Sequence, residues 1–383
     1  MPPRPLTAAL AALALGVAGA PAAHAQVAAP PSPVPNDPGR GASAGGWQAL
    51  QWNLLPTQSG IDAPGAWANV AAAGRPGGAG VTVAVLDSGV AYEDRGRFRR
   101  SPDLAQTRFA PGYDFVDRDP HPNDTYGHGT HVASTIAEST DNGIALTGVA
   151  WGATLLPVRV LDDGGYGRVR DIVDGLRFAV RRGADVVNLS LEFGPRVRSR
   201  QVRKLLRTLA WARRQGVLVV APSGNTGARR VALPARHPSV LAVGATTRRG
   251  CLADYSNRGK GLDLVAPGGG PDAVDDESPG CEPFGRAARS GSIFQVTFPR
   301  GRPKRFGIRG EVGTSMAAPH VAGAAALVIA GGTLGPDPAP GAVQARLTAT
   351  ARDLGAPGPD RRYGAGLLNA AAATAPAAPP RRR

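Results

Sequence analysis

Short apolar runs alternate with helical patterns along most of the chain, and this alternation restricts the fold more than any other feature of the sequence. Segments 168–182 and 202–215 place apolar residues three and four positions apart, which is typical of helices that cover a sheet. The alternation predicts an α/β fold of three layers, α/β/α, with a mostly parallel central sheet. We expect strands at Val81–Leu86, Thr154–Val160, Asp185–Leu191, Val217–Ala221, Val240–Val243 and Leu262–Val265.

Polar residues stand where these predicted strands end. Asp87 directly follows the first strand, Ser190 lies near the end of the third, and Asn225 comes four residues after the fourth. In parallel α/β sheets, functional residues gather beyond the carboxyl ends of the strands. The sequence therefore predicts one site at this edge of the sheet.

Residues 1–25 have the form of a signal peptide. Arg4 precedes an apolar run over Leu6–Ala20, and Ala23–Ala25 has the small-x-small pattern of a cleavage site. The apolar run is too short to span a bilayer comfortably, so we expect no membrane span. The predicted location is secreted, either extracellular or periplasmic, after cleavage near Ala25.

The rest of the chain divides by composition into three parts. Residues 26–46 are rich in Pro and Gly and read as a linker or a short prosegment, and residues 374–383 read as a tail. Residues 47–373 are expected to form one large domain. Within it, the Gly-rich and Arg-rich stretch 268–310 is predicted to be a surface insertion.

The strong positive charge does not by itself indicate a nucleic-acid partner. The chain has 44 basic and 29 acidic residues, a formal net charge of +15, and only three of the basic residues are lysines. The arginines scatter without an aromatic stacking ladder or a nucleic-acid motif beside them. We therefore expect a solvated basic surface, no nucleic-acid partner and a monomeric protein.

The chain has two cysteines, Cys251 and Cys281. Export would permit a disulfide between them, while the alternative is a pair of free thiols, because spacing alone cannot show whether the Cα atoms come within bonding range.

Three motifs carry the parts needed for hydrolysis by a serine. Asp87 begins the segment DSG at the tip of a predicted strand, His128 lies in GHGTHVA, and Ser315 lies in GTSMAAPH. Such chemistry needs a base that takes the hydroxyl proton, a carboxylate that orients the base, and donors for the developing oxyanion. The predicted helix start at Ser315 favours negative charge at its hydroxyl.

The three motifs, in the order Asp, His, Ser, resemble those of the subtilisin-like serine peptidases, and especially the thermitase-like secreted members. The resemblance implies a serine endopeptidase with polypeptide substrates, a triad of Asp87, His128 and Ser315, no catalytic cofactor, and Asn225 as an oxyanion donor. We expect activity to fall below about pH 7 as His128 becomes protonated. Two alternatives remain: an esterase or peptide ligase with the same triad, and a non-catalytic binding protein of the same fold.

The same resemblance assigns substrate-binding residues. Ser190, Leu191 and Glu192 would line the path of an extended peptide, and Ser223 and Gly224 would belong to the oxyanion loop. The family usually has glycine where this chain has Glu192 and Phe193. Either these side chains narrow the cleft and favour basic or polar substrate residues, or both turn to solvent.

The resemblance also implies a structural calcium ion. Asp37, Asp103 and Asn142 match ligand positions of the family, and their carboxylate and amide oxygens suit Ca²⁺. A second acidic cluster, formed by Asp272, Asp275, Asp276 and Glu277, lacks the spacing of an EF-hand and is expected to be a solvated loop. His131 and His320 lie inside the motifs but are expected to be packing residues.

Overall fold

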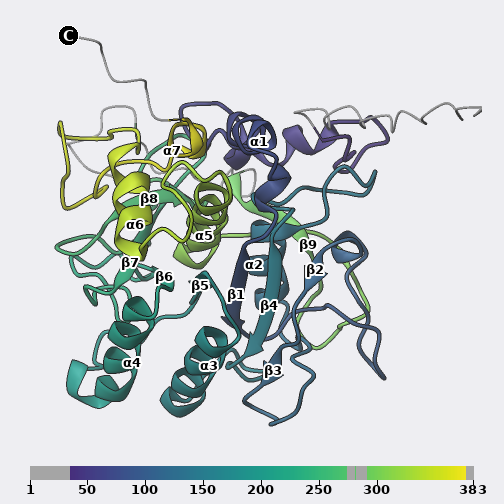
Figure 1. Ribbon diagram of the computed structural model, residues 1–383, viewed down its shortest axis with the longest axis horizontal. Coiled ribbons are helices and arrows are strands. Elements are labelled where there is room, and N and C mark those ends of the chain that lie inside the picture. The colour runs from purple at the N-terminus through teal and green to yellow at the C-terminus, as the bar shows by residue number, and fades with distance from the viewer. Residues whose placement is uncertain (1–34, 274–280, 282–290, 377–383) are drawn as a thin grey trace, which may run out of the picture. The chain divides into compact units, whose positions relative to one another are not determined.

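The computed structural model describes residues 35–273, 281 and 291–376, and the central feature of this part of the chain is a parallel sheet (Figure 1). The strand order is β2-β4-β1-β5-β6-β7-β8, with β3 also paired to β4. The strands are β1 (Thr82–Asp87), β2 (Arg108–Phe109), β3 (Tyr113–Asp114), β4 (Thr154–Arg159), β5 (Val186–Asn188), β6 (Leu218–Pro222), β7 (Val240–Thr246) and β8 (Leu264–Pro267). Each of the predicted apolar runs overlaps one of these strands, whereas the two-residue strands β2 and β3 were not predicted.

Helices cover both faces of the sheet, because side chains alternate along each buried strand. In β1, Val83 and Val85 join one apolar core, and Ala84 and Leu86 join the other. Figure 1 shows α3 and α4 on one side of the sheet and α1, α5 and α7 on the other. The helices are α1 (Ala63–Ala72), α2 (His128–Ala137), α3 (Val169–Arg181), α4 (Arg203–Arg214), α5 (Thr314–Ala330), α6 (Pro340–Ala349) and α7 (Ala370–Thr374). The predicted three-layer α/β/α fold is confirmed.

The central helix α5 differs from α3 and α4 in being apolar around most of its circumference. Its buried residues include Met316, Val321 and Leu327, whereas α3 and α4 bury one stripe each. A helix that is apolar all round belongs in the interior. In the described part of the chain, no helix combines the length and apolar character needed to cross a membrane.

The stretch 268–310 is more than a surface insertion. It contains an antiparallel hairpin, β9 (Ile293–Thr297) and β10 (Gly307–Glu311), and β9 packs against α2. Ile293, Val296 and Phe298 are buried. Composition did not predict that this segment joins the core, because its apolar residues stand among many glycines and arginines.

The start of the described chain is packed rather than linker-like. Asp37 is fully buried, and the Trp47 indole donates a hydrogen bond to the carbonyl of Pro35 at 3.0 Å. Residues 35–46 therefore differ from the prediction of a linker over 26–46. At the other end, Thr374 is buried as the last residue of α7, although it was assigned to the tail. The predicted signal peptide, residues 26–34 and residues 377–383 lie outside the described residues.

Candidate active site

Asp87 and His128 meet at the carboxyl edge of the sheet. Asp87 is the last residue of β1, and His128 is the first residue of α2. The Nδ1 atom of His128 lies 2.7 Å from Oδ1 of Asp87, and the Ser88 amide donates to the same oxygen at 2.7 Å. The Asp87 side chain is fully buried and the His128 side chain is 18% exposed, so the imidazole is held by a buried carboxylate while part of the ring remains accessible.

Glycine allows β1 and α2 to approach this closely. A Cβ atom on Gly129 would stand 2.1 Å from the carbonyl oxygen of Gly89 and 3.1 Å from the Asp87 side chain. Any larger residue would push the first turn of α2 away from the carboxylate. The Gly-His-Gly pattern of the sequence therefore has a steric reason.

Asp124 connects the two segments and was not identified from the sequence. It is fully enclosed and accepts hydrogen bonds from Ser88 Oγ (2.9 Å) and from Thr130 N and Oγ1 (2.9 and 2.6 Å). The amides of Tyr126 and Gly127 also donate to it, each at 2.9 Å. Asp124 thus links the turn after Asp87 to the start of α2 by hydrogen bonds. This linking role is visible in the structure, where the carboxylate is buried among donors, and not in the sequence.

Electrostatics favour the protonated form of His128. Burial alone would disfavour the charged ring, but the charge of Asp87, its hydrogen bond and the more remote charges of Glu311 and Asp124 raise the pKa of His128 to about 9. The ordinary value is 6.5. A raised pKa would move the acid limit of activity, expected near pH 7, to higher pH.

Ser315 lies in the first turn of α5, the helix that packs against both α2 and β5. Its hydroxyl donates to the carbonyl of Ser190 at 3.4 Å, while the Ser190 hydroxyl donates to the carbonyl of Ser315 at 2.9 Å. Asn188 in turn donates to the Ser190 hydroxyl at 2.8 Å. The end of β5 and the start of α5 are therefore bonded directly to each other, as the position of Ser190 in the sequence suggested.

Asn225 stands beside the same helix start. Its Oδ1 accepts hydrogen bonds from the amide of Thr314 (2.8 Å) and from the Thr314 hydroxyl (2.9 Å). These two bonds fix which way the amide group points. The Nδ2 atom and the backbone amide of Asn225 are directed instead at Glu192.

Glu192 does not turn to solvent. Its carboxylate accepts from Asn225 Nδ2 at 3.2 Å and from Asn225 N at 3.2 and 3.3 Å. Burial raises the pKa of Glu192, although the bonds from Asn225 lower it. Phe193 packs against the apolar core on the α3 and α4 side of the sheet, and Leu191 is buried.

Ser223 is placed differently from the prediction of a substrate-binding residue. It is fully buried, and its hydroxyl donates to the carbonyl of Asn257 at 2.8 Å. Its backbone amide and carbonyl bond Val243 and Ala232. Gly224, with φ of 115°, stands closer to the cleft, and a Cβ there would meet the side chains of Asn257 and Glu192. The hydroxyl and the backbone polar groups of Ser223 are therefore occupied by bonds within the protein that support the loop.

The other two motif histidines are packing residues. His131 Nε2 lies 3.0 Å from the carbonyl of Ile293, and burial lowers its pKa. His320 bonds the carbonyl of Met316 and the side chain of Asn53, and burial lowers its pKa to about 4. Both rings are therefore neutral at ordinary pH.

The predicted calcium ligands come together near the N-terminal segment. Asp37 accepts from the amides of Asp141 (3.0 Å) and Asn142 (3.1 Å), and Asp103 accepts from Asn142 Nδ2 (2.9 Å) and Leu146 N (2.9 Å). Burial, with the nearby charge of Asp37, raises the pKa of Asp103 to about 7. Glu138, which the sequence did not suggest, is a third buried acid whose pKa is raised by burial and by the charge of Asp103.

The negative charge of Asp37, Asp103 and Glu138 would suit a divalent cation. None of the three acids forms an ion pair within the described residues, and the hydrogen bonds that they accept offset only part of their charge, so a cation would stabilise them. Asn142 presents its Nδ2 to Asp103, while its Oδ1 accepts from the amide of Ile144 at 2.7 Å. Its amide group would have to rotate for the oxygen to serve as a ligand.

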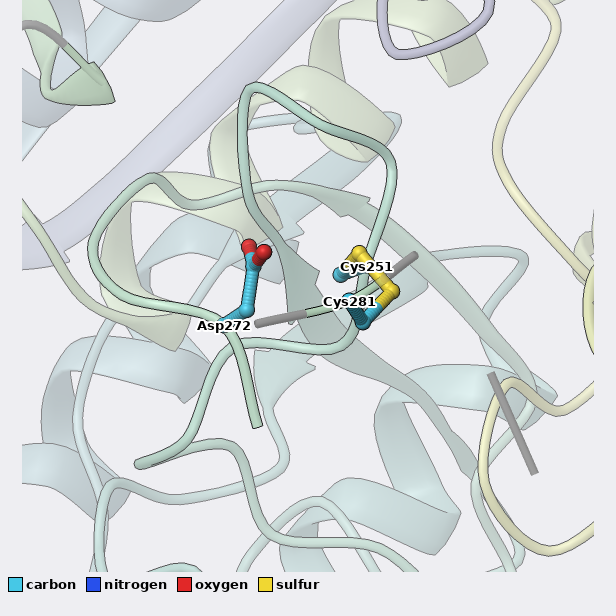
Figure 2. A group of neighbouring side chains, drawn as sticks. All are labelled: Cys251, Asp272 and Cys281. Carbon is cyan, nitrogen blue, oxygen red and sulfur yellow. A yellow bond between two sulfur atoms is a disulfide. The ribbon is translucent and has the colours of Figure 1, made fainter. Parts of the chain in front are cut away.

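The cysteines form a second cluster with Asp272, shown in Figure 2. Cys251 and Cys281 are joined by a disulfide with Cα atoms 5.8 Å apart, so neither sulfur is a free thiolate for a metal. Asp272 is buried and accepts from the Thr247 hydroxyl at 2.5 Å, with Arg249 Nε at 3.5 Å. It is therefore not part of a solvated loop, and Asp275, Asp276 and Glu277 lie outside the described residues.

Comparison with known proteins decides the family. Residues 78–366 match the sequence model of the subtilase family. The chain belongs to the subtilase family. Subtilisin Savinase from Lederbergia lenta is 40% identical over 299 residues, which cover 78% of this subtilase and 91% of that protein.

Solved structures agree with this assignment. The protease from Pseudoalteromonas arctica PAMC 21717 aligns with a TM-score of 0.71 and 30% identity over 89% of this subtilase and 98% of that chain. A lanthipeptide protease aligns with a TM-score of 0.62 and 28% identity over 77% of this subtilase and 86% of that chain. This subtilase is a serine-type endopeptidase.

Proposed function

We propose that this subtilase cleaves peptide bonds with Ser315 as the nucleophile, His128 as the general base and Asp87 as the group that orients the base. The observation that carries the proposal is the 2.7 Å contact between His128 Nδ1 and the fully buried Asp87 carboxylate. Because Nδ1 is bonded to Asp87, Nε2 is the ring nitrogen left to take the Ser315 proton and to pass it to the leaving amine. The packing of α5 against α2 supports the proposal, because Ser315 lies in the first turn of α5 and His128 begins α2.

The proposed reaction has two halves. As the Ser315 hydroxyl oxygen bonds to the scissile carbonyl carbon, its proton passes to His128 Nε2, and Asp87 stabilises the imidazolium. His128 then donates that proton to the leaving amine as the C–N bond breaks. Water attacks the acyl-enzyme in the same way, giving its proton to His128 and restoring the Ser315 hydroxyl when the ester bond breaks.

Asn225 Nδ2 and the Ser315 amide are the proposed donors to the developing oxyanion. The two bonds from Thr314 hold the Asn225 amide before the substrate arrives, so its orientation requires no reorganisation during the reaction. Ser190 and Leu191, just beyond β5, are the proposed contacts of the extended substrate chain. Gly224 lets the loop pass close to the side chains of Asn257 and Glu192, where a larger residue would collide with both.

We also propose a structural calcium ion held by Asp103, with Asp37 and Asn142 beside it. A bound ion would supply positive charge that balances these carboxylates and would take no part in the chemistry. Asp37 already bonds the loop that contains Asp141 and Asn142, so an ion here would strengthen the attachment of the N-terminal segment to that loop. No catalytic step depends on it.

The proposed location is outside the cytoplasm, and the proposed state is a monomer acting on polypeptides. The signal-like N-terminal pattern and the Cys251–Cys281 disulfide support export, because disulfides persist in oxidising compartments.

Active-site labelling tests the function. The purified protein is treated with a fluorophosphonate and assayed on casein, in comparison with Ser315→Ala. We expect wild type to be labelled and to cleave casein, and the variant to do neither. Casein cleavage that persists in Ser315→Ala, in a preparation free of other proteases, would overturn the assignment of the nucleophile.

A further inference from the structure

The Glu192 carboxylate occupies the donor groups of Asn225. Both carboxylate oxygens lie 3.2–3.3 Å from the Asn225 backbone amide, and one lies 3.2 Å from Nδ2. Glu192 forms no ion pair among the described residues, and its carboxylate is partly removed from water. These amide bonds are therefore the polar contacts that compensate its charge in the free protein.

The same side chain borders a cavity of about 220 Å³ behind the oxyanion loop. Glu192 and Phe193 form one part of its wall, Thr226 and Ala232 another, and Asn257 closes it near Gly224. A Cβ atom placed on Gly224 would lie 2.5 Å from Oε2 of Glu192 and 3.0 Å from the Ala232 side chain. Glu192 therefore stands between the Asn225 amides and the cavity.

A substrate whose scissile carbonyl binds Asn225 Nδ2 competes with Glu192 for that amide group, whereas the Asn225 backbone amide can keep its bonds to the carboxylate. Nδ2 carries two hydrogens, so the carbonyl weakens the one side-chain bond that the carboxylate accepts, whatever the substrate is. A half-buried carboxylate that loses part of this compensation and has no cationic partner is unfavourable. A cation brought in by the substrate removes that penalty, whereas a neutral side chain does not.

We propose that Glu192 selects substrates with lysine or arginine as P1, the residue on the acyl side of the scissile bond. The inference rests on the proposed function, because it requires Asn225 to bind the scissile carbonyl. In the bound state the P1 side chain enters the cavity that Glu192 lines, and its charged end pairs with this carboxylate. Selectivity arises because only a basic side chain brings a cation to a half-buried carboxylate that has no ion-pair partner among the described residues.

Two arginines in the cavity wall would repel a basic P1 side chain, so they favour the opposite result in the test. Arg230 and Arg236 also line the cavity and would attract an acidic side chain. Arg230 is exposed and borders two further surface hollows, so water screens its charge, whereas Glu192 is directly bonded to the site.

Three peptides that differ only at P1 measure the preference: lysine, norleucine, which has a similar length without the ammonium group, and glutamate. We expect wild type to cleave the lysine peptide with a kcat/KM about 10- to 100-fold above that of norleucine. Glu192→Gln keeps the shape and removes the charge, so its ratio is expected to fall within about threefold of one. Because glutamine accepts more weakly, the norleucine peptide is also expected to be cleaved faster by this variant.

Glu311→Gln is the matched control, since Glu311 contributes charge near His128 but does not line the cavity. It is expected to keep the lysine-to-norleucine ratio. Competitive inhibition by benzamidine gives an independent measurement, with binding expected to weaken about tenfold or more in Glu192→Gln. If that variant does not fold, Glu192→Ala takes its place.

An unchanged ratio in Glu192→Gln, or a wild-type preference for glutamate at P1, would overturn the inference. An equal loss of preference in Glu311→Gln would overturn it too, because selectivity would then reflect general charge. These results are distinct from failure of the proposed function, which would show as wild type that neither reacts with a fluorophosphonate nor cleaves any of the three peptides.

Discussion

Thr314 holds Asn225 by two hydrogen bonds, one from its backbone amide and one from its hydroxyl, at 2.8 and 2.9 Å to the same oxygen. The residue immediately before the nucleophile therefore orients the side chain proposed to bind the oxyanion. The same hydroxyl accepts a bond from the Gly224 amide at 3.3 Å, so the loop and the helix start are fixed together.

Replacing Asn225 with alanine is expected to lower kcat by about 10²- to 10³-fold, because one oxyanion donor is lost in the transition state. KM on a neutral peptide should change by only a few fold, since the bond is weak in the ground state. Steady-state kinetics on one peptide measures both constants. Thr314→Ser keeps both donors and serves as the control, and equal losses in both variants would contradict this role of Asn225.

Activity is expected to rise with pH through the pKa of His128, which lies near 9, because only the neutral ring accepts the Ser315 proton. At pH 7 kcat/KM should be about one hundredth of its plateau. The measurement is kcat/KM on a neutral peptide between pH 5 and 10. A midpoint near the ordinary histidine value of 6.5 would show that Asp87 does not raise the pKa in solution.

The same pKa shift affects stability in the opposite direction. Because the folded-state pKa of His128 is raised above 6.5, its ion pair with Asp87 stabilises the fold fully below pH 6.5, and this contribution is lost as pH rises through about 9. The decline in Tm over this window should be smaller in His128→Ala than in wild type. Parallel Tm curves for the two proteins would contradict the prediction.

Removal of calcium with EDTA is expected to lower Tm and to speed autolysis, and added Ca²⁺ should restore both. Burial raises the pKa of Asp103 to about 7, so Ca²⁺ affinity should fall as pH drops through that value, because the ion must displace a proton. Asp103→Asn should abolish the calcium dependence of Tm. Mg²⁺ is the control cation, and equal stabilisation by both ions would argue against a site of calcium type.

Asp124→Ala is expected to lower the free energy of unfolding by about 2–5 kcal/mol, since several buried donors lose their acceptor. Asp124→Asn retains one oxygen and should be less severe. Denaturant unfolding measures the stability, and the pH profile separates the roles: displacement of Asp87 from His128 would move the activity midpoint, whereas a purely structural effect would leave it in place.

The sequence predicted the sheet well because it depends on local patterns. Buried parallel strands are continuous apolar runs, so the sequence predicts β1, β4 and β6 from these runs alone. Asp87 and Ser315 stand in short motifs whose order restricts the fold. The hairpin of β9 and β10 was missed because its apolar residues lie among glycines and arginines and pack against a helix distant in sequence.

Contacts between residues far apart in the chain could not be predicted from the sequence. Glu192 and Asn225 lie 33 positions apart, and nothing in either local pattern indicates that one binds the other. Ser223 is the opposite case: its motif predicted a substrate contact, but the hydroxyl is bonded to the carbonyl of Asn257. A motif specifies which residues stand near a site, while packing decides which of their atoms face it.

The bond between Glu192 and Asn225 also bears on the end of each catalytic cycle. Peptide hydrolysis leaves a carboxylate on the acyl product, and Glu192 places a carboxylate of its own against the donor that the product would bind. With Asn225 as the oxyanion donor, the Glu192 carboxylate in the free enzyme occupies the place that the carboxylate of a bound product would take. A departing peptide would then compete with a tethered group that cannot diffuse away, and we expect product inhibition to be weak for this reason.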